Sequence, residues 1–167
     1  TSRLKNVLKL AAKNANWGKE LLEGHGQGLS VHYSFNSYVA SVVEVSVIDG
    51  KLKVHQVNTV IDCGVVVNKN TVISQMEGSA IFGMSLAFYG KITAKNGAVE
   101  QGNYHDYKMI RMNEAPKIQV EIVKSTENPS GVGEPGVPVI APAIINAIFK
   151  ATGKRYHNLP LSEVGLV

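Results

Sequence analysis

One carboxylate, Glu134, stands in a stretch of glycine, proline and small apolar residues, SGVGEPGVPVIAP at 130–142. Glycines allow a backbone to approach a ligand closely, and prolines stiffen it. Apolar surroundings favour the neutral form of a carboxylic acid, which tunes a general base toward neutral pH. The stretch therefore predicts a loop that presents a general base. The alternative is an exposed or helix-capping glutamate in a turn, and composition alone favours it because such turns are common before helices.

A second polar group lies in SQMEGSAIFG at 74–83, where Gln75 and Glu77 stand near the start of an expected helix. A side-chain amide donates and accepts hydrogen bonds in one plane, which suits the edge of a heterocycle. The alternative is a solvent-facing helix whose glycines serve packing, and without further information this alternative is favoured.

Two further pairs of residues are candidate catalytic groups. His105 and Asp106 form either a general-base pair or a surface loop held by side-chain hydrogen bonds. Cys63 with His55 suggests a thiol nucleophile, but Cys63 ends an apolar strand, where a buried cysteine acts as a small hydrophobe. We therefore do not expect a cysteine–histidine enzyme. The histidines are scattered and the single cysteine has no zinc-site spacing, so a protein-ligated zinc site is not expected either.

The composition restricts the class of protein. A chain of 167 residues with 44% apolar and 18% charged residues is expected to form one domain, 1–167, with a real core. The net charge is +4, with basic residues near both ends. Aromatic residues lie mostly elsewhere, so a solvated basic face is favoured over nucleic-acid binding. There is no apolar run of membrane-spanning length and no signal-peptide core. The first residue is not an initiator methionine, which suggests an excised piece or a processed chain.

The first half of the chain predicts one helix and a three-stranded meander. An apolar stripe predicts an amphipathic helix over 2–16, with Ser2 as its N-cap. The glycine-rich segment 24–28 is expected to be a loop. Strands are predicted at 29–35, 38–48 and 51–62, with a hairpin turn at Asp49–Gly50, one bulge in the third strand, and Val43, Val45 and Val47 on one face.

The second half predicts two helices and shorter strands. We expect a helix over 70–88 capped by Asn68 or Asn70, a hairpin over 91–100 with its turn at Asn96–Gly97, and a strand over 118–124. Residues 101–116 show no clean period. A buried helix is expected to begin near Pro142 and to end at Gly153. The predicted class is α+β: antiparallel β-meanders with three main helices packed on them.

Three stretches taken together resemble a known family: residues 62–85, 103–116 and 131–155, the last beginning GVGEPGVPVIAP. They are similar to the molybdenum-binding subunits of the xanthine dehydrogenase/aldehyde oxidase family, of the isoquinoline 1-oxidoreductase beta-subunit type. The resemblance runs in order from about residue 4 to 161. It implies that the chain is the C-terminal part of such a subunit, within its molybdopterin-binding domain.

The resemblance also implies a chemistry. Glu134 matches the glutamate that acts as general base next to molybdenum, Gln75 the glutamine that contacts the pterin, and Gly131, Val132 and Gly133 the loop that lines the cofactor. The implied reaction is hydroxylation of an aldehyde or N-heterocycle with oxygen from water. The implied cofactor is a molybdenum–pterin, expected in its cytosine dinucleotide form, and the implied partners are the remainder of the subunit and a [2Fe-2S] small subunit.

The isolated chain is expected to bind no cofactor and to be inactive. The alternative function is a non-catalytic structural or interaction module, whose apolar faces pair with the rest of the subunit or form a homodimer. Nucleic-acid binding is not expected. The substrate, the electron acceptor, the oligomeric state and the compartment, periplasmic or cytoplasmic in a bacterium, stay open.

Overall fold

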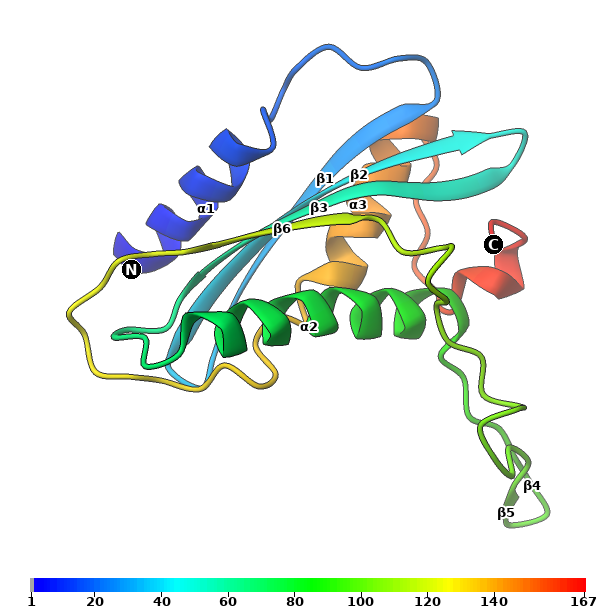
Figure 1. The fold of residues 1–167 in the computed structure, drawn as a ribbon. Coiled ribbons are helices and arrows are strands. Elements are labelled where there is room, and N and C mark those ends of the chain that lie inside the picture. The colour runs from blue at the N-terminus through cyan, green and yellow to red at the C-terminus, as the bar shows by residue number, and fades with distance from the viewer. Residues whose placement is uncertain (1) are drawn as a thin grey trace.

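The computed structural model describes residues 2–167, which form three α-helices around a four-stranded sheet (Figure 1). The elements are α1 Ser2–Asn14, β1 His25–Ser34, β2 Ser37–Ile48, β3 Lys51–Asp62, α2 Lys69–Tyr89, β4 Ala94–Lys95, β5 Ala98–Val99, β6 Lys117–Ile122, α3 Ile140–Thr152 and the 3-10 helix η1 Leu161–Val164. Within the described residues, no helix is both long and apolar enough to cross a bilayer.

The main sheet has the order β1-β2-β3-β6. The first three strands form the expected antiparallel meander, and Asp49 and Gly50 make its hairpin turn with φ values of 51° and 74°. The expected bulge is present, because Glu44 pairs with Gln56 and the next pair is Val45 with Val54. The sequence did not predict the partner of the last strand, and β6 runs parallel to β3. A parallel neighbour needs a crossover connection, and α2 with residues 90–116 provides it.

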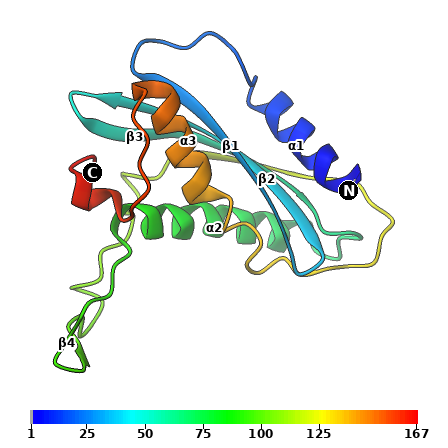
Figure 2. The same ribbon diagram turned by 180° about the vertical axis from the view of Figure 1, so that it is seen from behind.

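Helices cover both faces of the sheet (Figures 1 and 2). On one face α1 buries its apolar stripe against β2 and β3, in a small cluster of Val7, Ala11, Ala15, Ala40, Val42 and Val60. On the other face α2 and α3 pack on the main core, which includes Val43 and Val45, with Val47 packed against it. The prediction that these three valines share a face is confirmed, since side chains alternate along a strand.

The expected loop at 24–28 was wrong, because β1 already begins at His25. Gly24 does form a turn, with φ of 73°, whereas Gly26 and Gly28 lie in β1 and serve packing. A Cβ atom on Gly28 would lie 2.0 Å from the carbonyl oxygen of Ala143, and one on Gly26 would lie 2.2 Å from that of Ala147. Both positions therefore admit only glycine, and this allows α3 to lie directly on β1.

The helix ends largely follow the sequence signals. Asn68 caps α2 by accepting a hydrogen bond from the Thr71 amide at 3.0 Å, and Gly153 ends α3 with φ of 72°. The first helix is shorter than expected, and Ser2 is its first described residue and not its cap. Helix α3 begins two residues before Pro142 and buries one face only, since Phe149 is 39% exposed.

The chain between α2 and β6 leaves the body of the molecule (Figure 1). Its tip is the predicted hairpin, in which β4 pairs with β5 and Asn96 and Gly97 form the turn. We call residues 90–113 the arm. It starts at the C-terminal end of α2, whereas Gln75 lies in the first half of that helix.

Candidate functional site

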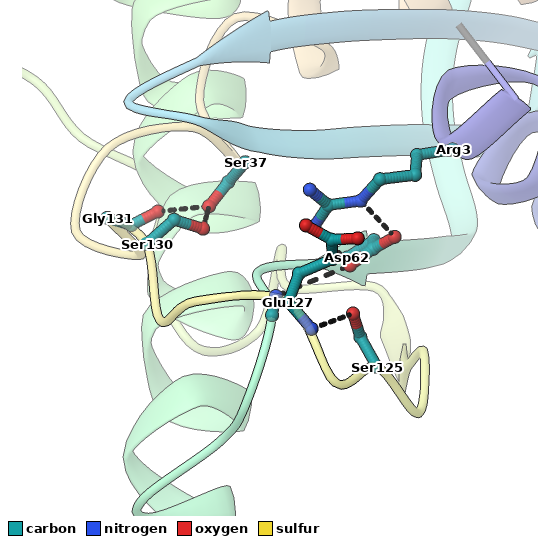
Figure 3. Close-up of polar contacts among 8 residues, drawn as sticks. Arg3, Ser37, Asp62, Ser125, Glu127, Ser130 and Gly131 are labelled. Carbon is teal, nitrogen blue, oxygen red and sulfur yellow. Dashed lines mark hydrogen bonds and ion pairs between the residues drawn. The ribbon is translucent and has the colours of Figure 1, made fainter.

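The loop that carries Glu134 is attached first to the end of the sheet. The Ser130 amide donates to the carbonyl oxygen of Cys63 at 3.0 Å, and the Gly131 amide donates to that of Phe35 at 3.0 Å. A Cβ atom on Gly131 would lie 2.7 Å from the Cβ of Phe35. The glycine at 131 is therefore required by contact with the β1–β2 turn (Figure 3).

Ser37 adds a side-chain attachment at the same place. Its side chain is fully buried at the first residue of β2. Its Oγ donates to the carbonyl oxygen of Gly131 at 2.6 Å and lies 2.7 Å from the Oγ of Ser130. Figure 3 shows the Ser37 side chain reaching from the strand to Ser130 and Gly131 on the loop. No sequence signal singled out Ser37.

The loop is attached a second time after Glu134, to helix α2. Pro135 and Gly136 are buried, and a Cβ atom on Gly136 would lie 2.9 Å from Ser79 Oγ and 3.0 Å from Met76 Sδ. The amide of Val137 closes a turn by donating to the Glu134 carbonyl oxygen at 3.0 Å. Glu134 thus lies on a short bridge between the sheet and α2.

Gln75 comes to this bridge from α2. An ideal Cβ atom on Gly133 would meet only the Gln75 Nε2, at 4.0 Å, and Gly133 does not have a positive φ. Neither packing nor backbone conformation therefore explains a glycine at 133. The structure thus places Gln75 beside Gly133, the residue that precedes Glu134.

The environment of Glu134 differs from the expectation. The residue is exposed, and within residues 2–167 its carboxylate has neither a hydrogen-bond nor an ion-pair partner. The apolar neighbours in sequence point elsewhere: Val139 and Ile140 enter the core, and Val132 packs against it. The described residues do not supply the desolvated setting that the sequence suggested.

The cysteine and histidine pairs fit their non-catalytic interpretations. Cys63 is 2% exposed, and burial raises the pKa of its thiol, which keeps it protonated at neutral pH. It helps to line an apolar hollow of about 240 Å³ beside Val132. His55 stacks on His25 with ring centroids 5.1 Å apart and lies 2.8 Å from Ser46 Oγ. His55 therefore has no contact with Cys63.

His105 and Asp106 lie on the exposed arm. The Asp106 carboxylate accepts the amides of Gly102 at 2.7 Å and Asn103 at 3.0 Å, and these bonds lower its pKa. His105 Nε2 is 3.9 Å from Asp106 Oδ2 and its side chain is 81% exposed. This is a surface loop held by side-chain bonds, at the opposite end of α2 from Gln75.

An ion pair that the sequence did not indicate holds α1 to the sheet. Arg3 donates to both carboxylate oxygens of Asp62, from Nε at 2.9 Å and from Nη2 at 2.6 Å (Figure 3). Asp62 also accepts the amide of Gly64 at 3.3 Å. Gly64 has φ of 75°, and a Cβ atom there would lie 2.1 Å from the carbonyl oxygen of Asn128. The pair therefore supports the turn on which the start of the loop rests.

This pair predicts a pH dependence of stability. The hydrogen bond from Arg3 is the largest cause that lowers the Asp62 pKa from its ordinary value of 3.8. A lowered pKa in the folded state contributes stability above 3.8, and that contribution is lost as the pH falls through the folded pKa. Asp62→Asn should lower the free energy of unfolding at pH 7 by roughly 2 kcal/mol, less than for a fully buried pair because Arg3 keeps some exposure.

Urea titrations of the 167-residue chain between pH 7 and pH 3 would measure this. The difference between the original chain and Asp62→Asn should shrink as the pH falls below 3.8. Asp49→Asn, in the exposed hairpin turn, is the matched control and should change little. A difference that stays constant over this pH range would contradict the role assigned to Asp62.

Comparisons with known proteins bear on this site. Residues 6–116 match the family described as molybdopterin cofactor-binding domain. The chain is 34% identical over 160 residues to isoquinoline 1-oxidoreductase subunit beta of Brevundimonas diminuta, which covers 93% of this chain and 20% of that protein. It is 31% identical over 162 residues to a membrane-bound aldehyde dehydrogenase (pyrroloquinoline-quinone) of Gluconacetobacter polyoxogenes, covering 93% and 21%. The chain thus spans about a fifth of the length of these curated relatives.

Solved structures share the fold. The aldehyde oxidoreductase from Desulfovibrio desulfuricans is 28% identical with a TM-score of 0.63, over 74% of this chain and 14% of that one. Quinoline 2-oxidoreductase from Pseudomonas putida 86 is 18% identical with a TM-score of 0.64, over 75% and 17%. The second likeness concerns the fold alone.

Proposed function

Because this chain belongs to the molybdopterin cofactor-binding domain family, we propose that it forms part of the molybdenum-binding subunit of an oxidoreductase. The proposed substrate is an aldehyde or an N-heterocycle, which is hydroxylated with oxygen from water. The observation that carries the proposal is the meeting of Gln75, from α2, with the loop of Gly133 and Glu134. These residues are far apart in sequence and serve no packing purpose where they meet.

Gly133 leaves backbone open to a cofactor. A glycine with neither a positive φ nor a close neighbour leaves backbone open on one side, and such backbone can lie against a flat ligand. The exposed amide of Gln75 can donate to and accept from the same ligand. The amide of Gly131 is already used by Phe35. We therefore assign the polar contacts with a pterin to Gln75 and the Val132–Gly133 backbone, and to Gly131 the close passage of the loop.

The chemistry divides between the cofactor and this chain. When bound, the molybdenum–pterin cofactor, proposed in its cytosine dinucleotide form, supplies the two-electron redox centre for oxygen transfer from water to carbon. For an aldehyde, the aldehyde and water yield a carboxylic acid, two protons and two electrons. Glu134 is proposed to accept one of these protons, since a carboxylate can act as a general base. A [2Fe-2S] small subunit is the proposed recipient of the electrons.

The remainder of the subunit is proposed to complete the site. The described residues leave Gln75 and Glu134 exposed, so contacts on the far side of a bound cofactor must come from other polypeptide. We expect the isolated 167-residue chain to bind little or no cofactor and to show no turnover. Incubation with the molybdenum cofactor, followed by gel filtration and molybdenum analysis, would measure this, with the complete subunit as positive control. Tight stoichiometric binding by the isolated chain would contradict it.

A second candidate function is a non-catalytic interaction module. It is favoured by the apolar side chains that the arm exposes, including Tyr104 at 87% and Met112 at 95%. Exposed large apolar groups of this kind mark association surfaces when they are contiguous. Gel filtration of the chain would reveal a homodimer formed through them. Full activity of the complete enzyme after loss of the Glu134 carboxylate would favour this function over the catalytic one.

A further inference from the structure

We infer that Ser37 is a positioning residue for Glu134, because it fixes the peptide group of Gly131 from which the loop projects. The inference rests on the proposed role of Glu134 as a general base. Ser37 lies on β2 and not on the loop, and it touches none of the residues assigned to the cofactor other than Gly131.

Gly131 is held by one hydrogen bond at its carbonyl oxygen and one at its amide, and we call this pair of bonds the clamp. The carbonyl oxygen of Gly131 accepts from Ser37 Oγ at 2.6 Å, and its amide donates to the Phe35 carbonyl at 3.0 Å. A serine hydroxyl has one hydrogen to donate, so Ser130 must be the donor in the 2.7 Å contact with Ser37. One buried hydroxyl thus joins the sheet to two consecutive loop residues.

The clamp stands on a rigid part of the sheet. Phe35 and Asn36 form a two-residue hairpin with φ values of 52° and 60°, and turns of this kind match the twist of paired strands. Ser34 and Ser37 flank it as the last pair of the β1–β2 register. The position of Ser37 is therefore set by the β1–β2 hairpin and does not depend on the loop that it holds.

Only a few residues separate the clamp from the Glu134 carboxylate. Glu134 is three residues beyond Gly131, and two residues later Gly136 is held against Met76 and Ser79. A displacement at Gly131 therefore passes to Glu134 and is not absorbed along the chain. A reacting group misplaced by about 1 Å can lower a rate by roughly 100-fold, so the clamp matters to catalysis more than its single hydroxyl would suggest.

The test uses the complete enzyme with Ser37→Ala and the matched control Ser41→Ala. Ser41 is also fully buried on β2, and its hydroxyl lies 2.8 Å from Thr59 Oγ1, away from the loop. Both variants remove one buried hydroxyl from one strand. We expect both to retain molybdenum, Ser37→Ala to lose roughly 100-fold in kcat with KM changed less than about 3-fold, and Ser41→Ala to keep kcat within about 2-fold.

Two further variants are expected to lower kcat by less than Ser37→Ala does. Ser130→Ala keeps the bond from Ser37 to Gly131 and should lower kcat much less than Ser37→Ala. Ser37→Cys keeps a side chain at this position but makes it a weak hydrogen-bond donor. If Ser37→Ala fails to fold, the comparison of Ser37→Cys with Ser41→Cys tests the inference instead. The kcat of Ser37→Cys should lie between those of the original enzyme and Ser37→Ala.

The outcomes separate this inference from the proposed function. Unchanged kcat in Ser37→Ala and Ser37→Cys, or equal losses at positions 37 and 41, would overturn the positioning role. If Glu134→Gln abolishes turnover while the Ser37 variants stay active, only the positioning inference fails. If Glu134→Gln itself stays active, the proposed function fails.

Discussion

Replacing Glu134 by glutamine in the complete enzyme is expected to leave the fold and the molybdenum content unchanged and to lower turnover by roughly 1000-fold or more. Glutamine has the same shape as glutamate but cannot accept a proton at neutral pH. The carboxylate is exposed and has no partner among residues 2–167, so its loss should not disturb packing. Steady-state rates normalised to molybdenum content would measure the effect.

A charge-matched control distinguishes proton transfer from a change in local field. Glu77 is also exposed, two residues beyond Gln75 on α2. Glu77→Gln removes the same charge from the helix that carries Gln75, on a different face of that helix, and should keep turnover within a few-fold. Near-normal turnover of Glu134→Gln with metal retained would exclude Glu134 as the base, and equal losses in both variants would indicate an effect of charge alone.

Replacing Gly28 by alanine is expected to cost the chain roughly 3 kcal/mol or more of its free energy of unfolding. The new Cβ atom would lie 2.0 Å from the carbonyl oxygen of Ala143 and 2.2 Å from the amide nitrogen of Ala147. Both are backbone atoms of α3, so no side-chain rotation relieves the contact and the helix must move away from β1. Urea denaturation of the 167-residue chain would measure the loss.

The same substitution at Gly78 is the control, and it should have the opposite sign. Gly78 lies within α2, and a Cβ atom there would meet nothing within 4 Å. Alanine should therefore stabilise the chain by about 0.5–1 kcal/mol through its better helix propensity. A cost below about 1 kcal/mol for Gly28→Ala would show that α3 is not held against β1 as closely as the structure has it.

Local sequence signals determined most of the elements. The Asp49–Gly50 and Asn96–Gly97 turns, the Asn68 cap and the Gly153 stop were all predicted, because each depends on the conformational preferences of a few neighbouring residues. The α+β class followed from these elements and is confirmed. Composition alone favoured non-functional interpretations of Gln75 and Glu134. The resemblance to a family was what assigned both residues to the site.

Only the tertiary structure decided which of these local features meet. The parallel pairing of β6, the bond between Arg3 and Asp62 and the clamp at Ser37 all join residues distant in sequence. A glycine in the sequence also does not reveal what its missing side chain makes room for. At Gly28 it is α3, at Gly131 it is a hairpin turn, and at Gly133 it is open space beside Gln75. The reason is physical: turn and cap preferences act over a few residues, whereas these contacts arise only when the packed core places separate segments side by side.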